Sequence, residues 1–157
     1  MDGILDSVAG LPMHPLIVHG AVVLVPLAAL GLMVMTVRPS FSRRFGVLVV
    51  IVAGVAALAS VAAKLSGEEF AEQVGVPAAH AELGDVMPLV AFGLFALGLV
   101  FWLVDRGIPG NKPRPGWLVV FAILLFLASV FAIYWTIRVG HSGAEATWAG
   151  VVERTDG

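Results

Sequence analysis

Hydrophobic residues in this chain occur in four long runs that are separated by short polar segments. The pattern predicts helices at residues 15–37, 45–65, 86–104 and 117–141, with residues 66–85 as the loop between the second and the third. Each run is long enough for a helix to cross a hydrocarbon core of about 30 Å. A helix also satisfies its own backbone hydrogen bonds in lipid. We therefore expect an all-α protein in which residues 1–157 form a single domain, an integral membrane four-helix bundle.

Composition supports this fold class. Of the 157 residues, 59% are hydrophobic and 13% are charged, and a soluble domain of this size lacks the polar surface to bury so much apolar area. The chain contains no cysteine, which excludes disulfides, thiolate metal sites and attachment of c-type haem within it. The net charge of −2 is too small to indicate a nucleic-acid partner.

Basic residues mark the two polar segments that follow the first and third runs. Six of the nine lie there, namely Arg38, Arg43, Arg44, Arg106, Lys112 and Arg114. The positive-inside rule places both segments in the cytoplasm. With four crossings, both termini are then extracytoplasmic, on the same side as ten of the eleven acidic residues.

All four histidines lie at the acidic end of the predicted bundle. His14 and His19 open the first run, His80 precedes the third, and His141 follows the fourth. His19 is expected to face the bundle interior, because a polar ring in lipid is costly. His14 precedes Pro15, which disfavours a helical conformation at His14 and lets it fold back. An isolated interfacial histidine is commonly a helix cap, so it is the clustering that predicts a ligand site on the extracytoplasmic face.

Three charged residues accompany the histidines. Lys64 and Arg138 lie within a turn of the outer boundary, where they either extend toward water or hold an anionic group. Glu145 follows His141 by four residues and shares its face if the helix continues. These charges extend the predicted site beyond the four imidazoles.

The two halves of the chain contain a weak internal repeat. The segment 19–32 matches 80–94 with one extra residue, and Leu65-Ser-Gly matches His141-Ser-Gly. If the repeat holds, the chain is two copies of a helical hairpin related by an axis along the membrane normal. In that alignment His19 corresponds to His80, and His141 takes the place of Leu65.

Two motifs resemble those of a known family. The opening His14-Pro-Leu-Ile-Val-His19 and the closing Gly140-His141-Ser-Gly143 are similar to those of predicted membrane proteins with domain of unknown function 2231. The resemblance spans nearly the whole chain, although Gly20-Ala21 stands where members usually have Phe-Pro. It implies a bacterial inner membrane protein, often beside or fused to redox modules such as Rieske or cytochrome c domains. It implies no established activity.

The first hypothesis for function is a small b-type cytochrome. Two histidines on facing helices can ligate haem iron axially in the core of a bundle. His19 and His141 are the preferred pair, because they lie on different helices at a similar depth, and Arg138 would meet a haem propionate. His14 and His80 complete the predicted set. Haem b implies electron transfer or redox coupling with a partner protein.

Two other hypotheses remain open. One is a divalent metal site for zinc or copper, formed by His19, His80 and His141 with Glu145 or Asp85. The other is a non-catalytic accessory subunit of a larger membrane complex, with the histidines at a contact. Catalysis is disfavoured, because no nucleophile stands in a recognisable arrangement with a base. A channel or carrier would have to be an oligomer, because no acidic residue lies mid-membrane.

Overall fold

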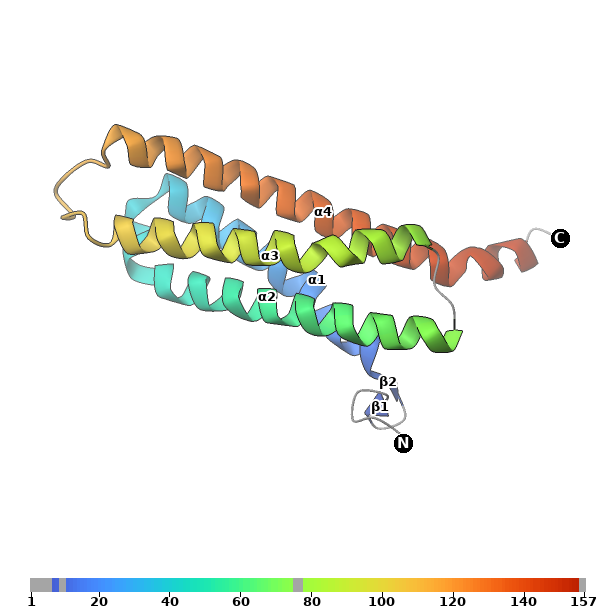
Figure 1. Cartoon of the computed structure of the whole chain (residues 1–157). Helices are drawn as coiled ribbons and strands as arrows, with labels where there is room; N and C mark the ends of the chain where they lie inside the picture. Colours follow the sequence, from blue (N-terminus) through green and yellow to red (C-terminus); the bar gives the residue numbers. More distant parts are fainter. Residues whose placement is uncertain (1–6, 9–10, 75–77, 156–157) are drawn as a thin grey trace.

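The computed structural model describes residues 7–8, 11–74 and 78–155. Two short antiparallel strands, β1 (Ser7–Val8) and β2 (Leu11–Pro12), precede four long helices (Figure 1). The helices are α1 (Met13–Val37), α2 (Pro39–Val74), α3 (Ala78–Asp105) and α4 (Gly116–Thr155). Each contains a stretch that is long and apolar enough to cross a membrane: Leu16–Val37, Pro39–Glu69, Ala78–Asp105 and Gly116–Glu145. The predicted all-α membrane bundle is confirmed.

The helices are longer than the hydrophobic runs predicted. Residues 66–85 are not a loop, because α2 continues to Val74 and α3 begins at Ala78. The cause is that glutamate and alanine favour a helix although they end an apolar run. Lys64 also pairs with Glu68 one turn later, at 3.4 Å. Residues 75–77, within the predicted loop, lie outside the described residues.

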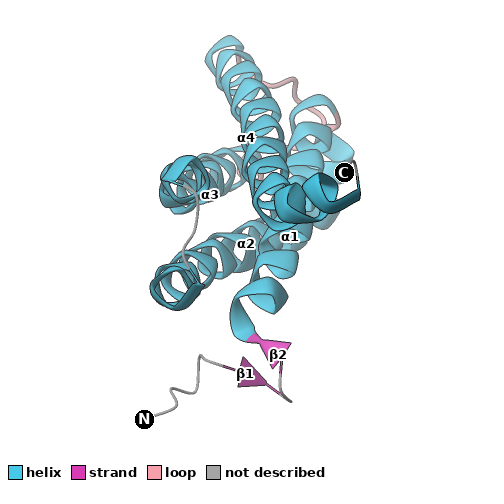
Figure 2. Ribbon diagram, turned by 90° about the vertical axis from the view of Figure 1, so that its right-hand side faces the viewer, coloured by secondary structure: helices cyan, strands magenta, loops and turns pink. Residues whose placement is uncertain are grey.

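The four helices form a bundle in which each has two close neighbours. α1 and α3 both pack against α2 and α4, and they lie at opposite corners of the bundle (Figure 2). Glycine permits close approach between neighbours: a Cβ on Gly46 would lie 2.3 Å from the Trp102 ring, and one on Gly98 would lie 2.6 Å from Leu32. Such contacts replace the hydrophobic driving force that is weak between helices in lipid.

Burial repeats between the two hairpins. Most buried positions of α1 recur in the same order in α3, and most of those of α2 recur in α4. The difference in residue number between matching positions is larger for α2 and α4 than for α1 and α3. The reason is that residues 106–115 join α3 to α4, whereas Arg38 alone joins α1 to α2. The packing therefore supports two copies of one hairpin. The matching buried pairs are Ala21/Met87, Val25/Ala91, Ala28/Leu94, Leu32/Gly98 and Met35/Phe101, and Val49/Leu125, Ala53/Ser129, Ala56/Ala132 and Ser60/Thr136.

One buried ion pair joins several segments of the bundle at the end where α1 meets α2. Arg114, in the α3–α4 connection, donates to both carboxylate oxygens of Asp105, at 2.7 and 2.8 Å. Ser42 of α2 donates to the same carboxylate at 2.5 Å. The guanidinium also donates to the carbonyls of Thr36 and Met35, the latter at 2.8 Å. It thereby satisfies groups that the end of α1 leaves without intrahelical partners.

Replacing Arg114 with methionine should destabilise the protein by about 3–5 kcal/mol, because it leaves the buried Asp105 carboxylate uncompensated. The measurement is reversible unfolding in mixed micelles. Arg106→Met is the matched control, since Arg106 is exposed and only stacks on Trp102, 4.8 Å from its ring centroid. Equal losses from the two variants would contradict a structural role for the buried pair.

Candidate functional site

Two histidines at the opposite end of the bundle make the same contact with the neighbouring helix. Nδ1 of His14, in the first turn of α1, lies 3.1 Å from the Ser66 hydroxyl on α2. Nδ1 of His80, in the first turn of α3, lies 2.9 Å from the Ser142 hydroxyl on α4. We call these four residues the paired-imidazole site. The site contains one His–Ser pair from each hairpin.

The hydrogen bonds of the serines are compatible with the same tautomer of both imidazoles. Ser66 Oγ lies 3.1 Å from the Ala63 carbonyl, and Ser142 Oγ lies 2.9 Å from that of Val139. A hydroxyl has one proton, so a serine that donates to this carbonyl accepts a hydrogen bond from Nδ1 of its histidine. In that tautomer Nδ1 is protonated and Nε2 carries the lone pair.

A glycine beside each serine makes room for the ring. A Cβ on Gly67 would lie 2.9 Å from Cε1 of His14, and one on Gly143 would lie 3.0 Å from Cε1 of His80. Any side chain at either position would displace an imidazole. The repeated Ser-Gly pair, which in the sequence marked only the internal repeat, is thus the surface on which each imidazole lies.

The structure corrects the alignment of the repeat at its histidine end. His14, not His19, corresponds to His80, whereas His141 does correspond to Leu65, as predicted. The expectation that Pro15 excludes His14 from the helix is also wrong, because α1 begins at Met13. Proline is compatible with a first helical turn, where its missing N–H has no intrahelical acceptor.

His14 and His80 belong to helices at opposite corners, and both side chains are half-buried. Burial lowers the pKa of His14, which precedes the membrane-spanning part of α1. A hydrogen bond with the Ala63 backbone acts in the opposite direction, and the nearby charge of His80 lowers the pKa further. At neutral pH His14 is therefore a neutral imidazole, the form that binds metals.

The other predicted histidines are placed differently. His19 is exposed, so the expectation that it faces the interior is wrong. The His141 side chain is 72% exposed and lies 3.2 Å from Glu145, which confirms that α4 continues and that the two share a face. The structure does not bring His19 and His141 together with the paired-imidazole site.

The two predicted cations, Lys64 and Arg138, each form a hydrogen bond with another side chain. Lys64 of α2 donates to Asp85 of α3 at 2.8 Å, which links two neighbouring helices. Arg138 is exposed and donates to the Tyr134 hydroxyl at 3.0 Å. Among the described residues, no three histidine or carboxylate side chains are grouped closely enough to hold a metal ion. The proposed set of His19, His80, His141 and Glu145 is therefore not assembled in this structure.

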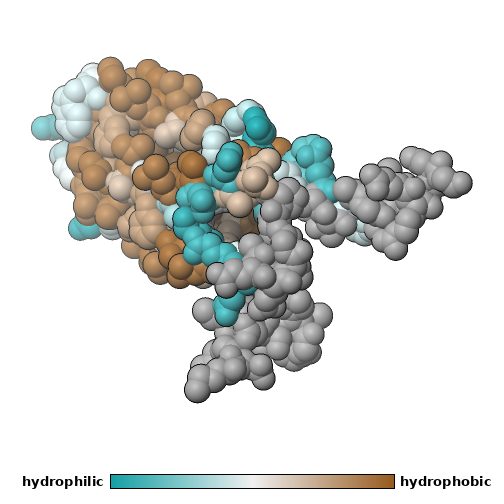
Figure 3. Space-filling model, turned by 45° about the vertical axis from the view of Figure 1, so that its right-hand side comes forward, coloured by the Kyte–Doolittle hydropathy of each residue, from teal (hydrophilic) through white to brown (hydrophobic). Residues whose placement is uncertain are grey.

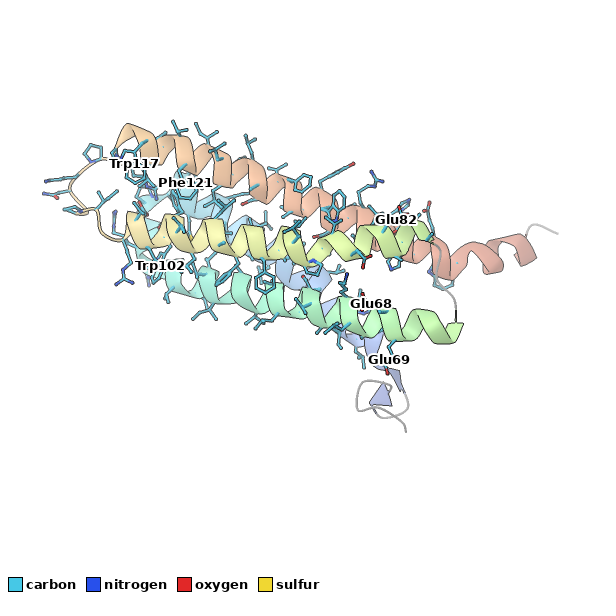
Figure 4. The ribbon with its side chains drawn as sticks, viewed as in Figure 1. Glu68, Glu69, Glu82, Trp102, Trp117 and Phe121 are labelled. Atoms are coloured by element: carbon cyan, nitrogen blue, oxygen red, sulfur yellow. The ribbon has the colours of Figure 1, made fainter. Side chains whose placement is uncertain are left out.

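The two ends of the bundle differ in their side chains. Glu68, Glu69 and Glu82 lie at the end that carries the paired-imidazole site, and Trp102 and Trp117 lie at the other (Figure 4). Figure 3 shows hydrophilic side chains gathered next to the apolar belt at the first of these ends. The paired imidazoles therefore lie at the boundary between the apolar belt and a polar, acidic end.

Comparison with known proteins confirms the family that the sequence resembles. A family model described as "Predicted membrane protein (DUF2231)" matches residues 10–156. The chain belongs to this family. No curated protein and no solved structure matches it. The paired-imidazole site of this DUF2231 protein is thus defined by its own geometry, and the family description adds only that it is a membrane protein.

The DUF2231 protein should lose stability as the pH falls below 6.5, the ordinary pKa of histidine. The pKa of His14 is lower in the folded state, so the unfolded chain binds a proton first and is favoured in acid. Thermal unfolding in detergent between pH 8 and 5.5 measures the effect. His14→Gln should flatten this dependence, whereas His141→Gln should not. Equal slopes for wild type and His14→Gln would refute the assignment.

Proposed function

We propose that the paired-imidazole site binds haem b, with Nε2 of His14 and Nε2 of His80 as the two axial ligands of the iron. The observation that carries the proposal is the serine contact at each Nδ1. It orients each ring and supports the tautomer in which Nε2 carries the lone pair. A hydrogen bond to the non-ligating nitrogen is the usual outer-shell support of a metal-binding histidine.

Haem suits this arrangement better than a bare metal ion. A bis-histidine haem requires two protein ligands, because the porphyrin nitrogens supply the other four. Structural zinc requires four protein ligands and catalytic zinc three. The described part of the chain offers two half-buried imidazoles and no group of three potential ligands. One imidazole from each hairpin also suits a planar guest whose two faces are equivalent.

This proposal replaces the axial pair that the sequence favoured. His19 and His141 are exposed, and His14 and His80 take their place. Lys64 and Arg138 supply the cations at this end of the bundle for the haem propionates. A haem there would serve electron transfer with a redox partner on the same side of the membrane. If the six basic residues at the other end are cytoplasmic, that side is extracytoplasmic.

Absorption spectra test the proposal. The protein is expressed with haem supplementation, purified in detergent and measured oxidised and after dithionite. We expect a Soret band with a reduced spectrum typical of six-coordinate haem b, and one haem per chain. His14→Ala and His80→Ala should each abolish or strongly shift these bands, and His19→Ala and His141→Ala should leave them unchanged.

Two further variants separate a ligand site from a purely structural contact. Ser66→Ala and Ser142→Ala keep both imidazoles but remove the outer-shell acceptors, and each should weaken haem binding about 10–100-fold. Helix content from circular dichroism confirms that the variants fold. A colourless protein, or bands that persist without His14 and His80, would exclude the haem proposal. Stoichiometric zinc or copper in a colourless protein would assign the site to a metal ion instead.

A further inference from the structure

A second polar site lies at the opposite end of the bundle, between the start of α2 and the α3–α4 connection. A pocket of about 300 Å³ opens there. Its lining contains Ser40, Arg43, Asp105, Gly110, Lys112 and Arg114. This pocket is independent of the paired-imidazole site, because it lies at the other end of every helix.

The charges of the pocket are unbalanced. Arg114 and Asp105 neutralise each other in the buried pair, with their side chains 9% and 2% exposed. Arg43 and Lys112 remain. The Arg43 charge also acts on the Asp105 carboxylate, but within the described ranges neither side chain forms a hydrogen bond or a close ion pair. The Arg43 guanidinium lies beside the connection, since a Cβ on Gly110 would be in van der Waals contact with its Cζ, at 3.7 Å. Two cationic donors from separate segments thus border one pocket.

We propose that this pocket binds the phosphate of an anionic phospholipid. Guanidinium and ammonium groups bind phosphate through charge-assisted hydrogen bonds, and basic clusters beside membrane-spanning helices attract anionic headgroups. The Ser40 hydroxyl, also on the lining, offers a further donor.

The position of the pocket at the depth of the lipid headgroups favours a lipid over a soluble phosphate. Trp102 and Trp117 lie at the same end of the bundle (Figure 4), and tryptophan is enriched at the depth of lipid headgroups. Val37 and Phe45, which flank the start of α2, are 64% and 39% exposed. They provide apolar surface for acyl chains beside a bound headgroup. A free phosphate ion would use the same donors without this contact.

Lipid titrations of the delipidated full chain test the proposal. Native mass spectrometry counts bound phosphatidylglycerol or phosphatidylcholine and yields a dissociation constant for each. We expect one phosphatidylglycerol to bind more tightly than phosphatidylcholine. The double variant R43Q/K112Q should weaken that binding roughly 30-fold, from the loss of two cations near the surface. Both side chains are exposed, so the fold should persist.

The matched control is R44Q/R106Q, which removes two cations at the same end that stack on Phe45 and Trp102. It should change binding of phosphatidylglycerol less than about threefold, since surface cations outside the pocket contribute only general attraction. Equal weakening by both double variants would show nonspecific surface charge and overturn the pocket. Displacement of the lipid by millimolar inorganic phosphate would assign the pocket to a soluble anion. Equal affinity for the two lipids would also refute the proposal.

Discussion

The requirement that buried polar groups find hydrogen-bond partners shapes both ends of this apolar bundle. The helices are hydrophobic on nearly every side, so hydrophobicity alone does not select an inward face. Hydroxyl side chains face the interior and donate to carbonyls of their own helix. Within the described residues, no buried side-chain donor or acceptor lacks a partner. The inward hydroxyls that show this are Thr36, Ser60, Ser129 and Thr136.

The same requirement is met differently at the two ends. At one end, each hairpin supplies a His–Ser pair, so the solution has the approximate twofold symmetry of the repeat. At the other end, the polar groups are partnered by a single Asp105–Arg114 pair. It has no counterpart in the first hairpin, because only the second hairpin has the connection that carries Arg114. The symmetric end therefore suits a guest held equally by both halves. The asymmetric end holds the helices together through the Asp105–Arg114 pair, and a separate pocket lies beside it.

The sequence predicted the helices and spans because length and hydropathy decide them, but it did not predict their ends, where Glu68 and Glu82 are polar yet helical. For the predicted haem site it favoured His19 and His141, whose side chains are exposed in the structure. His14 and His19 point about 140° apart on a helix, so at most one faces inward, and packing decides which. Two apolar segments can be aligned in many registers. The sequence alignment of the two halves therefore paired His80 with His19 and not with His14. The Asp105–Arg114 pair was missed because a charge in a connecting segment looks the same whether it is solvated or buried.

The paired imidazoles have a property that a simple interhelical contact does not require. Any small polar side chain can hydrogen-bond a serine across two helices, but only imidazole then retains a second nitrogen with a lone pair. Burial lowers the pKa of His14, so at neutral pH its ring can coordinate a metal without first losing a proton. The serine contact restrains both rings, and the adjacent glycines hold space for them. Restrained orientation is a feature of a preorganised ligand pair, and both hairpins supply it at equivalent positions.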